Sequence, residues 1–171
     1  MEKEILEKYR KAGSICSQAK KHAASMLKPG LRIAELAEGV EEYIRKHGGE
    51  PVFPVNVSIN ETAAHYTPTF NDAREIQEGE LVKIDVGVHV DGYITDSAFS
   101  YCSERNPMIG CAADAIKAAM KIIRPGIRVA EIGEEIEDFV KERGFGLIVN
   151  LTGHAVGHYI FHGVPSIPNI R

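Results

Sequence analysis

Hydrophobic and polar positions alternate along the chain in a way that first predicts two pairs of helices. Apolar residues recur at helical spacing over 5–27 and 109–123, and each segment is followed by Pro-Gly and a second amphipathic stretch, 33–44 or 129–140. The apolar faces of these helices are expected to be buried. For the third helix that face consists of Ile109, Ala112, Ile116, Ala119 and Ile123.

An internal repeat links the two helix pairs. The segment KPGLRIAELAEGVEEYIRKHG at 28–48 returns as RPGIRVAEIGEEIEDFVKERG at 124–144, at a constant offset of 96 residues. Each copy ends on a glycine, which is a common helix stop. One structural unit has therefore been used twice, and we expect a single domain over 1–171 with halves of about 1–104 and 105–171.

The first half turns β-rich after its helix pair. Alternating or continuous apolar runs at 51–59, 81–90 and 93–101 predict strands. Asp91-Gly92 separates the last two runs, and a two-residue Asp-Gly connection is a strong signal for a tight hairpin. The pattern predicts a sheet flanked by helices, which is a mixed α/β fold.

The hairpin connection sets the register of the two strands. Gly87 should face Asp96 and Asp85 should face Ala98, so the two aspartates become diagonal neighbours on one face. Gly87 is expected to leave the space between them open. The opposite face, which should pack into a core, carries Val82, Ile84, Val86 and Val88.

Two carboxylates held this close on a half-buried sheet repel each other unless a cation lies between them. Asp85 and Asp96 therefore indicate a metal site. The alternative is that both aspartates face solvent, or pair with Lys83 and a distant arginine, and the pattern alone leaves that alternative open.

A histidine-rich segment, TGHAVGHYIFHG, places His154, His158 and His162 four residues apart. Its glycines disfavour a helix, and its β-branched and aromatic residues favour a strand. Because a period of four also keeps side chains on one face of a strand, we expect one strand with the three imidazoles on the same side.

Composition narrows the functional class. The 171 residues are 44% hydrophobic and 26% charged, with a net charge of -4, and basic residues are scattered, which argues against binding to DNA. The charged amino terminus and the lack of a long apolar run predict a cytoplasmic protein without a membrane span. Three cysteines without C-x-x-C spacing indicate reduced thiols.

Three segments of the chain resemble those of a known family. The segments FPVNVSINETAAHYTP at 53–68, VKIDVGVHVDGYITDSAF at 82–99 and NLTGHAVGHYIFHGVPSIPNI at 150–170 are similar to type 2 methionine aminopeptidases, in their archaeal form. The AAHYTP segment is what points to type 2. The resemblance implies the pita-bread fold, a mixed α/β fold in which two pseudo-twofold halves enclose a two-metal site.

The resemblance also implies roles for individual residues. Asp85 would bind one metal, Asp96 would bridge both, and His154 would bind the other. His65 and His162 would contact the substrate and take part in catalysis without binding metal. The residues expected to line a pocket for the methionine side chain are Phe53 and Phe161.

The implied reaction is metal-dependent hydrolysis that removes an amino-terminal methionine when the second residue is small. The implied cofactors are two divalent ions, Co, Mn, Fe or Zn, among which ligand type does not choose. Implied partners are peptides or nascent chains with a transient association with the ribosome, and no DNA or membrane. The complete enzyme is expected to be a monomer.

The chain departs from the family pattern in one large respect. Two glutamate ligands lie after the last histidine motif in the family, and residues 1–171 do not contain them. The second half also lacks a counterpart of the hairpin at 81–101, so an open half-sheet should expose apolar surface, and the chain alone is expected to be inactive. Two alternatives remain: a non-catalytic pita-bread homologue that binds protein or RNA, and a creatinase- or prolidase-like hydrolase, which AAHYTP disfavours.

Overall fold

The computed structural model describes residues 2–171 and divides into two compact units. Unit 1 runs to Arg105 and also includes Gly157–Ile160, whereas unit 2 comprises Asn106–Val156 and Phe161–Arg171. The four predicted helices are confirmed. They are α1 (Lys3–Met26), α2 (Ile33–Lys46), α3 (Pro107–Ile122) and α4 (Val129–Lys141).

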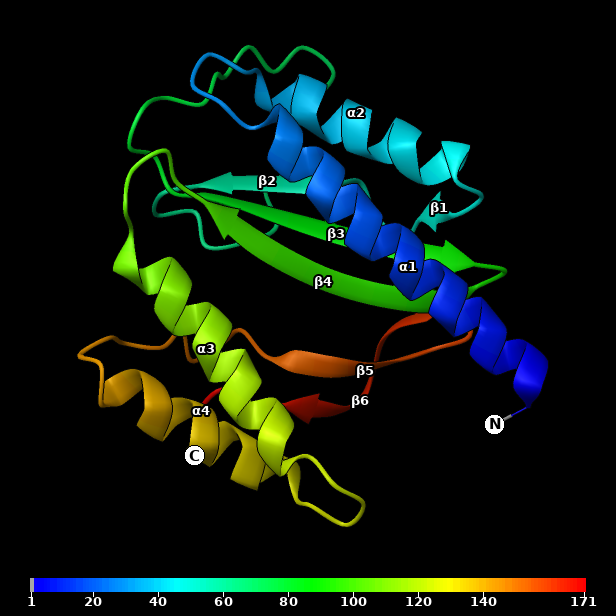
Figure 1. Cartoon of the computed structure of the whole chain (residues 1–171), viewed down its shortest axis with the longest axis vertical. Coiled ribbons are helices and arrows are strands. Elements are labelled where there is room, and N and C mark those ends of the chain that lie inside the picture. The colour runs from blue at the N-terminus through cyan, green and yellow to red at the C-terminus, as the bar shows by residue number, and fades with distance from the viewer. Residues whose placement is uncertain (1) are drawn as a thin grey trace. The chain divides into compact units, whose positions relative to one another are not determined.

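Unit 1 is built on an antiparallel sheet, shown in Figure 1. Its strands are β1 (Glu50–Pro51), β2 (Asn56–Ile59), β3 (Val82–Val90) and β4 (Tyr93–Tyr101). The strand β4 pairs with β3 along its full length, while β1 and β2 pair with successive parts of β3. The run predicted at 51–59 is thus two short strands, because Pro54 in the gap has no N–H for a ladder hydrogen bond.

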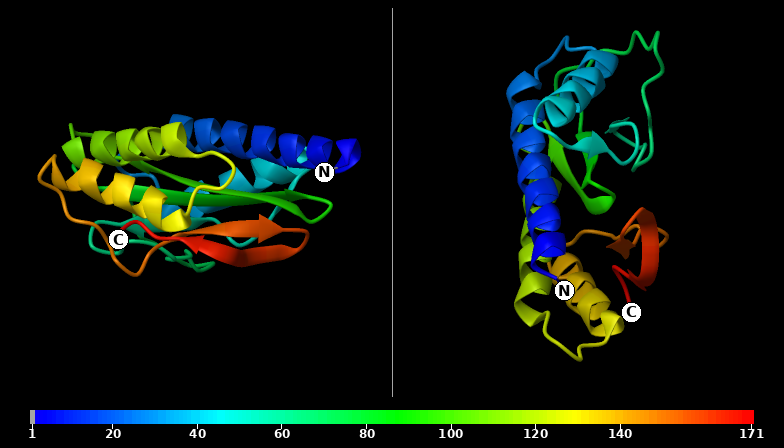
Figure 2. Two further views of the ribbon diagram at one scale, coloured as in Figure 1. Left: turned by 90° about the horizontal axis from the view of Figure 1, so that it is seen from below. Right: turned by 90° about the vertical axis from the view of Figure 1, so that its right-hand side faces the viewer.

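The core of unit 1 lies between this sheet and the two helices that cover one of its faces (Figure 2). The four valine and isoleucine side chains predicted to point inward from β3 are fully buried. They pack with small side chains of α1 and branched side chains of α2, which include Ala12, Ala19, Leu36 and Val40. The other face of the β3–β4 ribbon is therefore the one that carries the aspartates.

The turn between β3 and β4 confirms the predicted hairpin. Asp91 and Gly92 have φ angles of 49° and 80°, as a two-residue turn of the I′ type requires at both central positions. Gly92 is needed for a second reason, since a Cβ there would lie 2.3 Å from the Tyr159 ring. The Tyr159 amide donates a hydrogen bond of 2.8 Å to the Gly92 carbonyl, which holds the two segments together.

Replacing Asp91 by valine is expected to destabilise unit 1 by about 2 kcal/mol, because a β-branched residue is strained in the left-handed region. Asp91→Asn is the matched control, since asparagine tolerates that region and likewise loses the ion pair with Lys8. Urea denaturation of both variants measures the difference. Equal loss of stability in the two variants would show that the ion pair, and not the turn, is what matters.

Unit 2 contains α3, α4 and most of a two-stranded hairpin formed by β5 (Gly153–Gly157) and β6 (Ile160–Ile167). The prediction of one continuous strand with three aligned histidines is therefore wrong. The chain reverses at His158 and Tyr159, and Tyr159 has a left-handed φ of 55°. His154 lies on β5 and His162 on β6, while His158 lies in the turn.

The predicted buried face of α3 is confirmed only at Ala119 and is otherwise wrong. The residues that α3 buries are Cys111, Ala115, Ala118 and Ala119. Ile116 and Ile123 are instead 61% and 55% exposed, which agrees with the expectation of apolar surface in the second half. Cys111 and Ala115 pack with Val140 of α4, and the neighbouring isoleucines of the third helical segment stay open to solvent.

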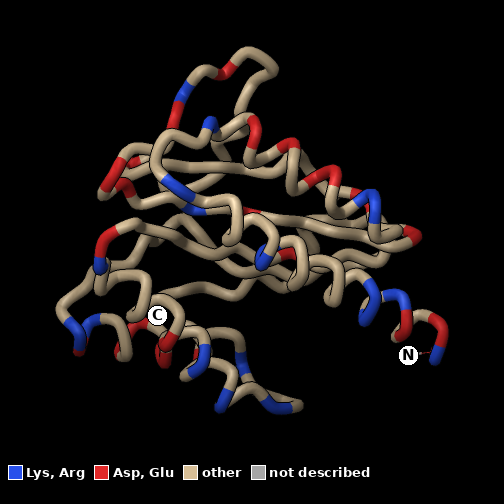
Figure 3. Tube along the Cα trace, turned by 45° about the horizontal axis from the view of Figure 1, so that its top comes forward, with Lys and Arg blue, Asp and Glu red and all other residues tan. Residues whose placement is uncertain are grey.

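Charged residues of both signs are distributed along the helices and loops (Figure 3). Neighbouring charges form several exposed ion pairs within helices, such as Lys117 with Asp114 and Arg45 with Glu41. Of the helices in residues 2–171, none is long and apolar enough to cross a membrane. The three cysteines are present as free thiols, as predicted.

Candidate active site

The aspartate face of unit 1 has the predicted register. Asp85 pairs with Ala98 and Gly87 pairs with Asp96, so the two carboxylates are diagonal neighbours on the face turned away from the core. Both side chains are half-buried. Partial burial strengthens the repulsion between two negative charges and favours a cation beside them.

The space over Gly87 is occupied, which corrects the expectation that it is open. A Cβ on Gly87 would lie 2.4 Å from Cε1 of Phe53, so the Phe53 ring rests directly on the Gly87 backbone. Glycine is required here to admit the aromatic ring. The two aspartates therefore border an apolar wall, which the sequence pattern did not indicate.

Asn56 joins this face and was missed by the sequence reasoning. It pairs with Asp85 across β2 and β3, which directs the two side chains to the same side of the sheet. Asn56 Nδ2 donates hydrogen bonds of 2.9 Å to the Pro54 carbonyl and to Thr67 Oγ1. The available signal was its position in the short strand before the AAHYTP segment, where an asparagine interrupts an apolar run.

His65 lies in the loop that follows β2. Its side chain is exposed, and its φ of 65° is unusual for a residue other than glycine. Such a conformation costs about 1 to 3 kcal/mol and persists only where the surrounding structure enforces it. A strained, exposed imidazole of this kind is a feature of functional loops.

The hairpin of unit 2 brings together the other predicted site residues. The rings of His154 and His162 have centroids 4.5 Å apart, and Phe161 lies edge-on to His154 at 5.4 Å. His154 is half-buried and its Nδ1 lies 3.2 Å from the Ala155 carbonyl oxygen. Two imidazoles and an aromatic ring thus form one cluster at the β5–β6 hairpin.

His158 has structural contacts in unit 1. Its ring stacks on Tyr93 with centroids 4.6 Å apart, and its Nε2 lies 2.9 Å from the Asp91 carbonyl oxygen. These contacts attach the hairpin turn at 158–159 to the turn of the β3–β4 ribbon. His158 thus has contacts that hold this turn in place.

The donors present suit a divalent metal. Carboxylates on one sheet face and an imidazole on the β5–β6 hairpin match the mixed oxygen and nitrogen ligation of Mn, Fe, Co and Zn. The carboxylates belong to unit 1, whereas His154 and His162 belong to unit 2. Across residues 2–171, the structure gathers no group of three or more His, Cys, Asp or Glu side chains that would hold an ion.

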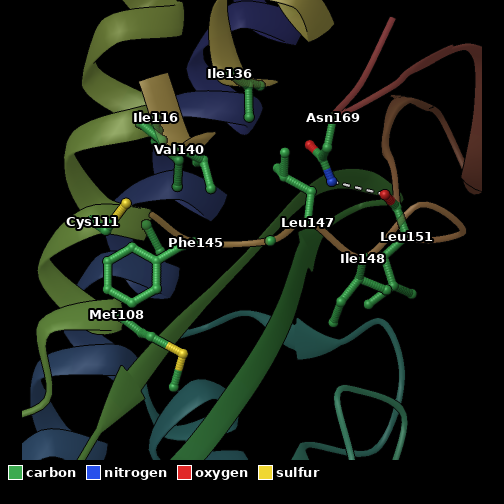
Figure 4. A pocket seen from close by; sticks show the side chains of 13 residues that line it. Met108, Cys111, Ile116, Ile136, Val140, Phe145, Leu147, Ile148, Leu151 and Asn169 are labelled. Carbon is green, nitrogen blue, oxygen red and sulfur yellow. Dashed lines mark hydrogen bonds between the residues drawn. The ribbon is translucent and has the colours of Figure 1, made fainter. Parts of the chain in front are cut away.

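An apolar cavity of about 340 Å³ lies elsewhere in unit 2 (Figure 4). Met108 and Ile116 of α3, Val140 of α4 and the Phe145 ring line it, and Asn169 donates a hydrogen bond of 2.7 Å to the Leu151 carbonyl at its edge. It contains none of the predicted site residues. In unit 1 the repeat counterpart of Met108 is Ala12, which is fully buried in the core beside the sheet.

Comparison with sequences of known proteins gives a consistent family. Residues 7–171 match the model of metallopeptidase family M24. A methionine aminopeptidase of Archaeoglobus fulgidus is 46% identical over 170 residues, which cover 99% of this chain and 58% of that protein. One from Methanothermus fervidus is 42% identical over an aligned stretch of 181 positions, which covers 97% of this chain and 96% of that protein.

Solved structures confirm the fold. The methionine aminopeptidase of Thermotoga maritima superposes with a TM-score of 0.93 at 28% identity, over 99% of this chain and 72% of that one. The prolidase of Pyrococcus furiosus superposes with a TM-score of 0.86 at 27% identity, over 98% of this chain and 51% of that one. The mixed α/β pita-bread fold is therefore confirmed, and this chain matches 51% and 72% of the two longer structures.

The residues that match the M24 model include both sheet aspartates and the histidine cluster, and M24 peptidases are metal-dependent. The chain spans 58% of the Archaeoglobus fulgidus relative and 55% of the Thermococcus onnurineus relative. The chain therefore belongs to metallopeptidase family M24, and within it to the methionine aminopeptidases of archaeal type.

Proposed function

We propose that this protein removes the amino-terminal methionine from nascent proteins and peptides whose second residue is small. The observation that carries the proposal is the diagonal placement of Asp85 and Asp96 on one face of the β3–β4 ribbon, where Gly87 is the cross-strand partner of Asp96. This arrangement supplies two carboxylates from rigid strands, which is what a shared metal site needs. The relatives with 42–47% identity are methionine aminopeptidases.

In the proposed site, Asp85, Asp96 and His154 would hold two divalent ions, and Asp96 would be the ligand common to both. Bound metal of this kind supplies a water of lowered pKa and polarises the scissile carbonyl. Family resemblance implies two further glutamate ligands that residues 1–171 do not supply. We propose that a cytoplasmic enzyme containing all of these ligands carries the activity.

His65 and His162 are proposed to contact the peptide substrate. Each has an exposed imidazole that can donate a hydrogen bond to the scissile peptide and to the oxygen that gains charge. Phe53 and Phe161 are proposed to bind the methionine side chain, whose thioether packs well on aromatic rings. The Phe53 ring lies over Gly87, the cross-strand partner of Asp96, and the Phe161 ring lies beside His154, which supports this assignment.

The test is to isolate the protein from its native source, to compare its intact mass with 18.8 kDa, and to assay it with Co²⁺ or Mn²⁺. We expect a larger mass and release of methionine from Met-Ala-Ser, with little cleavage of an Xaa-Pro dipeptide. A mass of 18.8 kDa with no turnover would favour the non-catalytic alternative, in which the fold binds protein or RNA.

Preferential cleavage of the Xaa-Pro substrate would instead favour the prolidase-like alternative. The structural likeness to the Pyrococcus furiosus prolidase makes this the competing activity to assay. The two substrates differ at the second residue, so the assay separates the two enzyme classes directly.

A further inference from the structure

The strained backbone of His65 requires an explanation in its surroundings. The residue is exposed, so burial of its own side chain does not hold its φ at 65°. A left-handed non-glycine residue relaxes unless its neighbours over-determine its conformation. The residues that hold it must therefore be sought in the loop that follows β2.

Tyr66, the next residue, is fixed at its backbone and at its ring. Its amide donates a hydrogen bond of 3.2 Å to Ser58 Oγ, and its carbonyl accepts one of 2.8 Å from the Val57 amide. Its ring packs against the core of unit 1. The backbone of residue 66 is thereby tied to β2, whose Asn56 pairs with Asp85.

The Tyr66 side chain also links the two ends of the loop segment 66–74. Its hydroxyl donates a hydrogen bond of 2.6 Å to Asp72 Oδ2, and Asp72 Oδ1 accepts one of 2.9 Å from the Arg74 amide. The Arg74 guanidinium lies 4.5 Å from the centroid of the Tyr66 ring. The hydroxyl–carboxylate bond raises the pKa of Tyr66 and lowers the pKa of Asp72, as expected for a charge-assisted bond.

We propose that Tyr66, Asp72 and Arg74 form a clasp that holds His65 in its left-handed conformation and thereby positions the imidazole relative to the strand of Asp85. The three are positioning residues, because they act through His65. The inference rests on the proposed function only for the substrate contact of His65. The mechanical link from Tyr66 through β2 to β3 is independent of it.

The test removes the hydroxyl alone, with Tyr66→Phe, and measures amide exchange by NMR in the whole chain. This substitution removes the hydrogen bond from the Tyr66 hydroxyl to the charged Asp72 carboxylate. Exchange at the Val57 amide, which donates to the Tyr66 carbonyl, is therefore expected to rise about tenfold or more. The His65 ring resonances should shift or broaden. Tyr43→Phe is the matched control, since its hydroxyl makes only a long, exposed bond of 3.4 Å to Gln18.

A second substitution, His65→Gly, separates positioning from general stability. Glycine adopts positive φ without strain, so the double variant Tyr66→Phe, His65→Gly should return exchange at Val57 to within about threefold of the wild type. Asp72→Ala should repeat the effect of Tyr66→Phe. Unchanged exchange and unchanged His65 resonances in both clasp variants, or no rescue by glycine, would overturn the clasp.

Methionine release by the native-length protein is measured in parallel. If the clasp variants leave Val57 exchange and the His65 resonances unchanged while the protein releases methionine normally, the clasp is refuted and the proposed function stands. If the clasp variants change Val57 exchange and the His65 resonances but the protein releases no methionine, the clasp is supported and the proposed function is refuted.

Discussion

Replacing Asp96 by alanine in the protein of native length is expected to abolish methionine release and to weaken Mn²⁺ or Co²⁺ binding by at least about a hundredfold. Asp96 faces Gly87 in the ribbon and is diagonal to Asp85, so one carboxylate of the pair is removed without disturbing the strand pairing. A metal held by both aspartates, as proposed, would then lose one of its ligands. Calorimetric titration with the metal and hydrolysis of Met-Ala-Ser measure the two effects.

Asp114→Ala is the matched control for this variant. Asp114 is an exposed carboxylate of α3 that pairs with Lys117 at 2.8 Å, which also explains its lowered pKa. The same change of charge there should leave metal binding and turnover unaltered. Normal turnover by the Asp96 variant would refute the assignment of Asp96 as a metal ligand.

Replacing Leu36 by alanine is expected to lower the free energy of unfolding of unit 1 by about 3 kcal/mol. Leu36 is 0% exposed and lies on the α2 face that packs into the core cluster with Ile84 and Val57. Removing it costs the transfer free energy of the lost methyl and methylene groups, and it leaves a cavity that the close-packed sheet and helix fill poorly. Urea denaturation followed by circular dichroism measures the loss.

Leu6→Ala on α1 is the matched control, because it makes the same leucine-to-alanine change at a partly exposed position. Leu6 is 36% exposed near the start of that helix, so the same truncation should cost less than about 1 kcal/mol. Similar losses in both variants would contradict the description of the α2 face as the centre of the core.

The helices and the ribbon of unit 1 are predictable from sequence because their signals are local. Pro-Gly breaks, a four-residue apolar spacing and terminal glycines locate each helix to within a few residues. The two-residue Asp91-Gly92 turn leaves one register for the strands, so the relation of Asp85 to Asp96 follows without tertiary information.

The predictions that the structure corrects failed because they depend on contacts between segments that are distant in the sequence. The buried side of α3 depends on which elements cover it, and an apolar stripe in the sequence does not reveal that. The position of the Phe53 ring over Gly87 joins residues on separate segments, and sequence distance carries no information about such a contact. The reversal at Tyr159 is carried by a left-handed tyrosine, which no turn propensity indicates.

The sequence by itself therefore determined the helix pairs, the aspartate register and the family, because these rest on short-range periodicity, turn chemistry and motifs. Only the tertiary structure decided that His158 turns away to stack on Tyr93, that Asn56 lies opposite Asp85, and that Tyr66 joins Asp72. These are contacts between segments that meet only when the chain folds, so they depend on packing and not on any local pattern.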